Sequence, residues 1–433
     1  MRRALPALIL LAPLLALATP DSHEAAAVVE GGDSMILLLS VLGLISAAYL
    51  LTHFIVDRLQ KWLLFVSGAE YILLGLVLSQ SRVLGELSSL SSMIALAAGW
   101  IGLLYGMELD IRKMISEAGY STRMSVVDVI FSGGGVAVCG YLFFHYGMDL
   151  PADESALAGG VLGCASAAGS SSAVDLLIER YRSAENGLLA LLRRTAQLSD
   201  ALAILAFGVL MCVFHQGETL TVTPPAISDW VLFTGLLGVG LGWLFAAFLG
   251  DDTSENSRFL ALVGIIAFAS GAAFFLNLSI LTVNLLLGLV LINTRQGRDA
   301  HATLKDTARP LSLILLVCAG LLWAPVEPIP ALIAAGGYLS LRMLFKALGC
   351  FIASLGTPLR RDLFRGLMAQ GHVAVAIAVS LRLFYDGEAA ELAYTAILVS
   401  VVVNELFASR LLKGLLVDAG DVRQDISLSR EVV

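Results

Sequence analysis

The sequence predicts an all-α membrane protein with about thirteen transmembrane helices, because apolar runs of about 20 residues, the length that spans a bilayer as a helix, recur along it. Of its 433 residues, 58% are hydrophobic and only 14% are charged. A soluble domain carries roughly 25% charged residues. Short polar loops separate the apolar runs, and Lys and Arg gather in alternate loops. These observations indicate that most of the chain lies in a bilayer.

The N-terminus has the form of a secretory signal peptide. Arg2 and Arg3 precede an apolar run at residues 4–17, and Ala16-Leu17-Ala18 fits the small-x-small pattern of a cleavage site. We therefore assign residues 1–18 to a signal peptide, with an uncleaved first span as the alternative. Both assignments place the polar segment 21–33 outside the cell membrane.

The transmembrane domain is expected at residues 35–415, followed by a short cytoplasmic tail at 416–433. Its predicted spans are separated by Gly, Pro and charged residues, which favour loops. They lie approximately at 35–56, 62–79, 92–109, 124–146, 154–177, 188–214, 229–249, 259–276, 279–293, 310–324, 331–352, 364–385 and 391–412.

Basic residues in alternate loops support this order of spans, because cytoplasmic loops are enriched in Lys and Arg. The predicted inner loops carry Arg58, Lys61, Arg112, Lys113, Arg123, Arg180, Arg182, Arg295, Arg298, Lys305, Arg309, Arg360, Arg361 and Arg365. The acidic inner loop 250–258 departs from the pattern. We expect a multi-pass protein of a bacterial-type inner membrane, with the mature N-terminus outside and the C-terminus in the cytoplasm.

Charged groups inside the predicted spans point to a site. A charge at the centre of a spanning helix costs about 2.5 to 3.5 kcal/mol on insertion scales, so intramembrane charges are usually functional. At 1.5 Å per residue, Asp200 lies roughly 10 Å from the inner end of its span, and Lys346 about 9 Å from the inner end of another. Arg342 lies four residues before Lys346 on the same helix face.

Other polar residues fall at the same depth in separate spans. They are Gly169, Ser170, Ser171 and Ser172 in one span, Gln370, Gly371 and His372 in another, and Asn404 and Glu405 in the last. Polar groups from several helices that converge near the midplane are typical of an ion site in a transporter.

Structural roles remain open for these residues. Asp200 could be a structural carboxylate that Lys346 or Arg342 neutralises. His372 could be a hydrogen-bonded packing residue, and the serines of 170–172 could be small residues that let helices approach. Three hydroxyls after Gly169 equally suit an unwound helix segment.

The chain carries no pattern of an enzyme or a cofactor protein. The five cysteines all fall within apolar spans without CxxC spacing, which indicates core residues rather than a disulfide framework or metal centre. No HExxH or paired-aspartate protease site is found. We therefore expect neither a cofactor nor a nucleic-acid partner.

Several motifs, in chain order from residue 35 to 415, resemble the cation/proton antiporter superfamily, and within it the Kef-type branch. Gly106-Met107-Glu108-Leu109-Asp110 resembles the family's GlELD, and Ser170-Ser171-Ser172-Ala173 its SSTA. Leu198-Ser199-Asp200-Ala201 occupies the place of the acidic pair. Leu278 to Leu291 resembles lSplLgaflaGlvL, residues 366–371 resemble glxprGe, and Phe345-Lys346-Ala347-Leu348-Gly349 resembles gKxlg.

This resemblance implies an inverted-repeat fold in which two discontinuous helices, spans 154–177 and 364–385, cross beside the essential Asp200. It implies that Lys346 is the buried basic partner, that the protein is a homodimer, and that a core domain moves like an elevator. Three residues depart from the family's pattern: Ser199 replaces a carboxylate, Gln370 a basic residue and His372 an acidic one.

The expected function is therefore exchange of a monovalent cation, Na⁺ or K⁺, for protons through Asp200. Burial in a low dielectric favours a neutral carboxyl group, so a proton and a cation can compete for it. Oxygens of Ser199 and of Ser170, Ser171 and Ser172 would complete the cation's shell, with Lys346, Arg342 and Glu405 as charge partners in the core. Because Ser199 leaves a single carboxylate, the exchange is expected to be electroneutral. Alternatives are a sodium-coupled solute symporter of similar fold and a non-transporting membrane sensor or scaffold.

Overall fold

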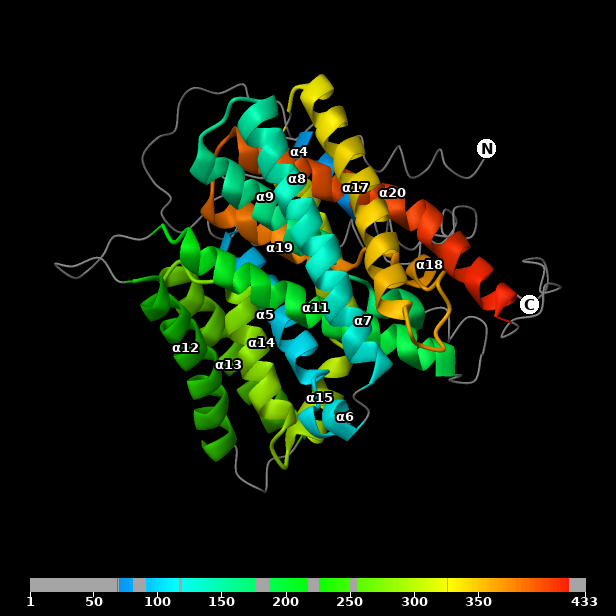
Figure 1. Cartoon of the computed structure of the whole chain (residues 1–433). Helices are drawn as coiled ribbons and strands as arrows, with labels where there is room; N and C mark the ends of the chain where they lie inside the picture. The colour runs from blue at the N-terminus through cyan, green and yellow to red at the C-terminus, as the bar shows by residue number, and fades with distance from the viewer. Residues whose placement is uncertain are drawn as a thin grey trace, which may run out of the picture.

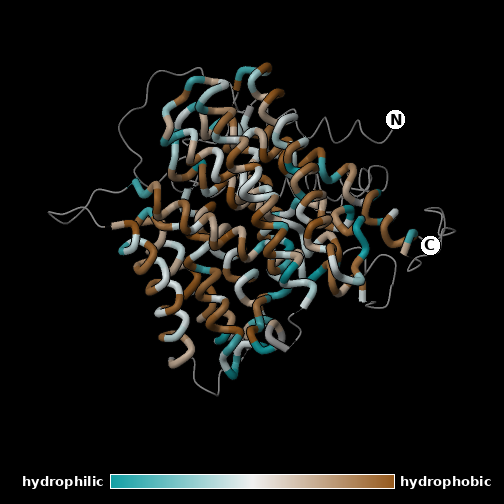
Figure 2. The backbone as a smooth tube through the Cα atoms, in the orientation of Figure 1, coloured by the Kyte–Doolittle hydropathy of each residue, from teal (hydrophilic) through white to brown (hydrophobic). Residues whose placement is uncertain are grey.

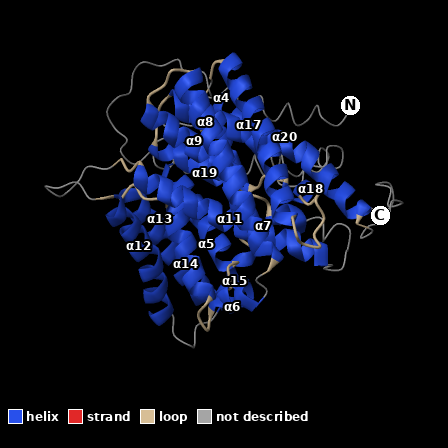
Figure 3. Cartoon of the chain, in the orientation of Figure 1, coloured by secondary structure: helices blue, strands red, loops and turns tan. Residues whose placement is uncertain are grey.

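The computed structural model describes residues 68, 70–80, 91–116, 119–175, 187–216, 226–248, 255–324 and 326–419. This part of the chain consists of helices joined by loops and turns (Figure 3). The all-α prediction is therefore confirmed for the described residues. The predicted signal peptide at 1–18 and the first predicted span at 35–56 lie outside them.

Seven helices in the described part are long and apolar enough to cross a membrane. They are Tyr120–Gly147, Ala152–Asp175, Gly187–Val213, Ile227–Ala247, Ser257–Phe275, Pro328–Ser354 and Glu388–Asp418. Shorter apolar helices accompany them, and hydrophobic residues run along most of the helices, with hydrophilic ones concentrated towards loops and helix ends (Figure 2). The chain is thus a multi-pass membrane protein, whereas the full set of spans and their orientation remain predictions.

The helices follow the predicted spans closely from residue 92 onwards, with boundaries that differ by a few residues (Figure 1). In chain order they are α4 (Glu70–Gln80), α5 (Ser91–Met107), α6 (Ile111–Ser116), α7 (Tyr120–Asp128), η3 (Val129–Gly134), α8 (Gly135–Leu142), η4 (Phe143–Gly147), α9 (Ala152–Ala167), α11 (Gly187–Val213), α12 (Ile227–Phe248), α13 (Glu255–Phe275), α14 (Ile280–Ile292), α15 (Gly297–Lys305), α16 (Ala308–Leu321), α17 (Pro328–Ser354), α18 (Phe364–Leu367), α19 (His372–Phe384) and α20 (Glu388–Asp418).

Glycines let pairs of these helices pack with their backbones in contact. α5 and α14 make the most extensive of these contacts. A Cβ atom on Gly106 of α5 would overlap the carbonyl oxygen of Leu285, and one on Gly288 of α14 would overlap that of Leu103. In lipid, helices gain little from the hydrophobic effect when they associate, so van der Waals packing holds them together. Small residues favour this packing because they let the backbones come close. This packing places α12, α13 and α14 side by side, across the bundle from α17 and α20 (Figure 1).

Two helices are interrupted where the sequence predicted polar residues at a common depth. α9 ends at Ala167, residues 168–170 are not helical, and a helix resumes at Ser171. α18 ends at Leu367, residues 368–371 are not helical, and α19 begins at His372. Both interruptions lie within predicted spans, 154–177 and 364–385.

The helix of residues 120–147 differs from a regular α-helix in a way that the sequence did not predict. Two π-helical segments, η3 and η4, lie within it, and η3 begins directly after Asp128. The Ser132 hydroxyl donates to the Asp128 carbonyl at 2.7 Å within this turn. Wider π turns often mark functional positions in a helix, which draws attention to Asp128.

Candidate functional site

The two helix interruptions lie against each other. The Gly371 N–H donates to the Gly169 carbonyl at 3.0 Å, so one interruption pairs with the other through the backbone. A Cβ atom on Gly371 would come within 2.9 Å of the Ser170 hydroxyl oxygen. A side chain at position 371 would therefore force Ser170 to shift.

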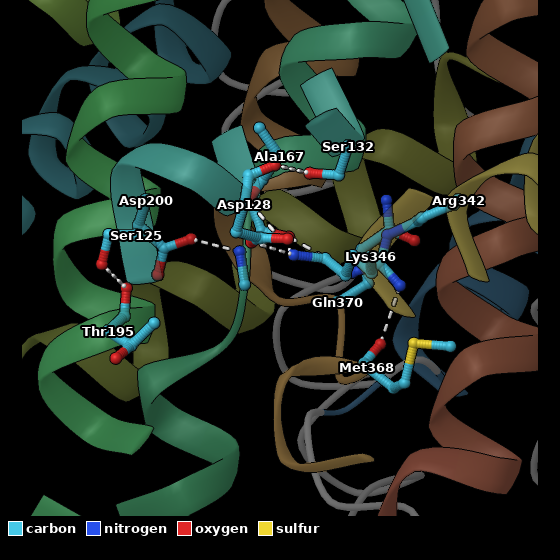
Figure 4. Close-up of polar contacts among 12 residues, drawn as sticks. Ser125, Asp128, Ser132, Ala167, Thr195, Asp200, Arg342, Lys346, Met368 and Gln370 are labelled. Carbon is cyan, nitrogen blue, oxygen red and sulfur yellow. Dashed lines mark hydrogen bonds and ion pairs between the residues drawn. The ribbon is translucent and has the colours of Figure 1, made fainter. Parts of the chain in front are cut away.

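Arg342 of α17 donates hydrogen bonds to carbonyl groups at the two interruptions, where the helical pattern of hydrogen bonds is broken. Its guanidinium donates to the carbonyl of Met368 at 2.8 Å (Figure 4) and to those of Ala168 at 3.2 Å and Ala369 at 3.4 Å. Its side chain is fully buried. Since the C-terminal end of a helix carries a partial negative charge, a cation beside the ends of α9 and α18 is favourable. One side chain thus connects both interruptions.

Asp200 contacts the first interruption at the Gly169 N–H, whereas Arg342 contacts it at the Ala168 carbonyl. It belongs to α11, it is fully buried, and its Oδ1 accepts a hydrogen bond from the Gly169 N–H at 2.8 Å (Figure 4). Here the carboxylate faces the start of the helix that resumes at Ser171, where the helix dipole is positive. The interrupted segment therefore positions Asp200 through a backbone donor rather than through a basic side chain.

Two oxygen atoms at positions 199 and 200 are buried without hydrogen bonds. Oδ2 of Asp200 and Oγ of Ser199 both lack a partner among the described residues. Leaving such groups unsatisfied costs about 1 to 3 kcal/mol each, so each of them calls for an explanation, and a bound ion is one that fits a pair of neighbouring oxygens. One charged and one neutral oxygen suit a hard monovalent cation or a proton.

The serines after Gly169 take two different roles. The Ser170 hydroxyl accepts from the Ala173 N–H at 3.2 Å, which caps the helix that begins at Ser171. Ser170 and Ser172 also share a hydrogen bond at 3.1 Å between their hydroxyls. Ser171 is buried, and Ser172 is half-buried. The unwound segment, one of the two alternatives left open for these serines, is present at residues 168–170. A cation bound there would meet hydroxyls whose positions these hydrogen bonds already fix.

Gln370 anchors the second interruption through all of its hydrogen-bonding capacity. Its Nε2 donates to the Ala165 carbonyl at 3.2 Å and to the Tyr338 hydroxyl at 2.9 Å. Its Oε1 accepts from Ser400 at 3.0 Å and from Asn404 at 3.1 Å. A neutral amide therefore ties α9, α17 and α20 together at the position where the family resemblance led us to expect a basic residue.

Lys346 has a partner that the sequence analysis did not identify. Its Nζ forms an ion pair with Oδ2 of Asp128 in α7 at 2.7 Å, and both side chains are buried. Nζ also donates to the Ala167 carbonyl at 3.4 Å. Among the described contacts neither Lys346 nor Arg342 bonds to Asp200, which was the structural alternative left open for this carboxylate.

Asp128 could have been found with the depth calculation that identified Asp200. It lies four residues into the predicted span 124–146, or about 6 Å at 1.5 Å per residue. This depth is close to that of Lys346 in its own span. An intramembrane carboxylate calls for a functional hypothesis wherever it occurs, so Asp128 qualifies on the same ground as Asp200.

The remaining predicted residues lie at the margin of the cluster. Glu405 is buried in α20, and its Oε1 accepts from the Gly68 N–H at 3.1 Å, so its described contact is not with Lys346 or Arg342. His372 is the first residue of α19 and is half-buried. Among the residues searched, no group of three His, Cys, Asp or Glu side chains could hold a metal ion.

Interrupted helices that meet beside a buried carboxylate, inside a bundle of apolar helices, are typical of secondary ion transporters. Residues 71–414 match the sodium/hydrogen exchanger transmembrane family, and the chain belongs to that family. The prediction of a cation/proton antiporter is confirmed by this match, as is the expectation that the chain is not an enzyme. Its assignment to the Kef-type branch stays a prediction.

The fold is similar to that of the sodium proton antiporter MjNhaP1 from Methanocaldococcus jannaschii. Its structure at pH 8 has a TM-score of 0.62 and 15% sequence identity, with 91% of this chain and 100% of that chain covered. An electron microscopy structure of the same antiporter has a TM-score of 0.59, 16% identity and the same coverage. At such identities the likeness establishes the fold. No curated protein sequence matches the chain significantly.

Proposed function

We propose that this protein exchanges a monovalent cation, sodium or potassium, for protons through Asp200. The observation that carries the proposal is the buried Oδ2 of Asp200, which has no hydrogen bond among the described residues and lies next to the equally unpartnered Oγ of Ser199 in sequence. A proton or a cation on Oδ2 would satisfy the carboxylate. Competition between the two for one oxygen couples their movements in opposite directions.

The energetics of a buried charge supply the reason that exchange is obligatory. A bare carboxylate is expensive to carry through a bilayer, whereas a protonated or cation-bound one is neutral. We propose that only the neutral forms of Asp200 cross with the mobile part of the protein. Ser199, Ser170, Ser171 and Ser172 would supply neutral oxygens to a cation, which suits Na⁺ or K⁺ better than a divalent ion.

The paired interruptions support the crossing arrangement that the family resemblance implies. They occur in two predicted spans that lie far apart in the sequence, and the hydrogen bond from Gly371 to Gly169 joins them. We propose that they are the discontinuous helices of two inverted repeats, and that alternating access moves them together. A homodimer with an elevator-like core is the corresponding assembly.

The stoichiometry follows from position 199. Since Ser199 stands where an acidic pair would have its first carboxylate, one proton replaces one monovalent cation and the cycle moves no net charge. We therefore expect purified protein in liposomes to dissipate a pH gradient when Na⁺, K⁺ or Li⁺ is added. An imposed membrane potential should leave the rate nearly unchanged. A rate that follows the potential would contradict the electroneutral cycle, and absence of exchange with all three cations would contradict the function.

The competing hypothesis is a sodium-coupled symporter of similar fold. It requires that an organic solute stimulate sodium uptake, and it does not require proton movement. Measuring sodium uptake with and without candidate solutes at constant pH separates the two functions. A membrane sensor or scaffold would show neither flux.

A further inference from the structure

We infer that Asp128 is a positioning residue that keeps Lys346 away from Asp200, so that Oδ2 of Asp200 stays open to the transported cation. This inference rests on the proposed exchange through Asp200. It adds a residue that belongs to a different helix, and it explains why the buried lysine does not occupy the site.

Lys346 forms a short, buried ion pair with Asp128. Its Nζ lies 2.7 Å from Asp128 Oδ2 and 3.4 Å from the Ala167 carbonyl, and the side chains of both ion-pair partners are at most 1% exposed (Figure 4). Lys346 nevertheless lies near Asp200, because its Nζ contacts the Ala167 carbonyl while Asp200 accepts from the Gly169 N–H two residues further along the chain. The same ammonium group therefore has two carboxylates in its surroundings and makes its hydrogen bond to only one of them.

The backbone around Asp128 fixes the choice. Asp128 has a short side chain, and it reaches Lys346 because α7 and α17 approach closely. A Cβ atom on Gly349 of α17 would lie 3.3 Å from the Asp128 Cα. The Ser125 hydroxyl, one turn earlier in α7, donates to the Thr195 carbonyl of α11 at 2.9 Å. Asp128 is thus held between the helix of Lys346 and the helix of Asp200.

Charge balance gives Asp128 its significance for transport. The buried charges of Asp128 and Lys346 cancel, so the lysine does not neutralise Asp200. The guanidinium of Arg342 bonds to backbone carbonyls and leaves the Asp200 carboxylate to a cation or proton. Position 199, next to Asp200, carries a serine instead of a second carboxylate. The second carboxylate of the site comes from α7, where its Oδ2 is bonded to the lysine.

Removal of the Asp128 charge should release Lys346 towards Asp200. A buried ammonium without a partner is strongly unfavourable, and the flexible lysine stem can turn to another acceptor. Asp200 Oδ2 lacks a donor among the described residues, as Ser199 Oγ does, and once the charge at position 128 is removed Asp200 is the charged acceptor near the lysine. A cation would then have to displace an ammonium group before it could bind.

The test is a double-mutant cycle on exchange in liposomes, with the apparent KM for Na⁺ as the readout. We expect Asp128→Asn to raise this KM about tenfold or more when Lys346 is present, and to change it less than about threefold when Lys346 is replaced by Gln. The matched control is Asp153→Asn, an exposed residue in the first turn of α9. A merely structural role for Asp128 would lower the yield or the maximal rate without a lysine-dependent change in KM.

The outcomes are decisive in each direction. An unchanged KM in Asp128→Asn, or an equal rise in the Lys346→Gln background, overturns the inference. If Asp128→Asn does not fold, Lys346→Gln is compared with the double variant Asp128→Asn, Lys346→Gln. Equal KM values support the inference, and values more than about threefold apart show that Asp128 acts without the lysine. If the wild-type protein exchanges no cation for protons, the proposed function fails, and this result is distinct from an exchanging protein in which Asp128→Asn has no effect.

Discussion

Replacement of Arg342 by methionine should destabilise the junction of the two helix interruptions. Methionine has a similar length and no donor, so the carbonyls of Met368, Ala168 and Ala369 would lose the guanidinium that connects them. These carbonyls cannot turn to water, because Arg342 is fully buried in the bundle. The interruptions would remain joined mainly through the Gly371 to Gly169 hydrogen bond.

The expected cost follows from the geometry of these contacts. The bonds to Met368 at 2.8 Å and Ala168 at 3.2 Å have good lengths, and the third at 3.4 Å is long. Two hydrogen bonds from a charged donor contribute about 3 to 6 kcal/mol together. Removal of a buried cation also removes its desolvation penalty, which offsets part of that loss. We therefore expect the free energy of unfolding to fall by about 2 to 4 kcal/mol.

Chemical unfolding in detergent micelles measures this change. Arg342→Lys should recover only part of the stability, because an ammonium group cannot reproduce the planar fork of the guanidinium. The matched control is Arg298→Met, at an exposed position of α15, where we expect a change within about 0.5 kcal/mol. If Arg342→Met unfolds like the Arg298→Met control, the guanidinium does not hold the interruptions together.

Three other predictions test separate parts of the structure. Gln370→Leu removes the hydrogen bonds of Gln370 with the Tyr338 hydroxyl, the Ser400 hydroxyl and the Asn404 amide, so the free energy of unfolding should fall by about 2 to 4 kcal/mol; equal unfolding of variant and wild type would refute the network. Gly106→Ala forces a methyl group onto the α14 backbone and should cost about 1 to 3 kcal/mol in the same measurement, whereas a neutral result would mean that α5 and α14 separate easily. Asp362 lies in the loop before α18, and hydrogen bonds from the Arg360 guanidinium hold the pKa of its carboxyl below the ordinary value. A lowered folded pKa adds stability above the unfolded pKa of about 3.9 that is lost as the pH falls through the folded value. Asp362→Asn should therefore lower the melting temperature slightly at neutral pH, and the difference should close in acid; a difference that grows in acid would contradict the sign.

Much of the fold could be predicted because each membrane-spanning helix requires a continuous apolar run, which can be recognised in the sequence. A span has to be apolar over its whole length, so the predicted spans from 92–109 to 391–412 match apolar helices within a few residues at most ends, whereas the short helices α6 and α15 lie outside every predicted span. The interruptions were also predictable, since glycine and serine side by side, as at Gly169 and Ser170, leave a helix weakly specified. The π-helical turn after Asp128 was not, because it depends on how α7 packs rather than on its composition.

The depth of the site residues in the bilayer could be predicted from the sequence. The ion-pair partner of Lys346 could not. Counting residues along a helix gives the level of a side chain in the bilayer, and Asp200, Lys346 and Arg342 do lie in one buried cluster. The direction in which each side chain points depends on which helices are neighbours. That information lies in packing between distant segments, and for this reason Lys346 was expected at Asp200 whereas it bonds to Asp128.

The central claim is that Asp200 carries the exchanged ions, and its most direct test is Na⁺-driven proton movement in liposomes that contain Asp200→Asn. Asparagine keeps the size of the side chain and can still accept from the Gly169 N–H, while it can bind neither a proton nor a cation as a carboxylate does. We predict that this variant folds and shows no exchange, whereas Asp153→Asn, a matched change at an exposed position, exchanges like the wild type. Exchange that persists in Asp200→Asn would remove this carboxylate from the mechanism.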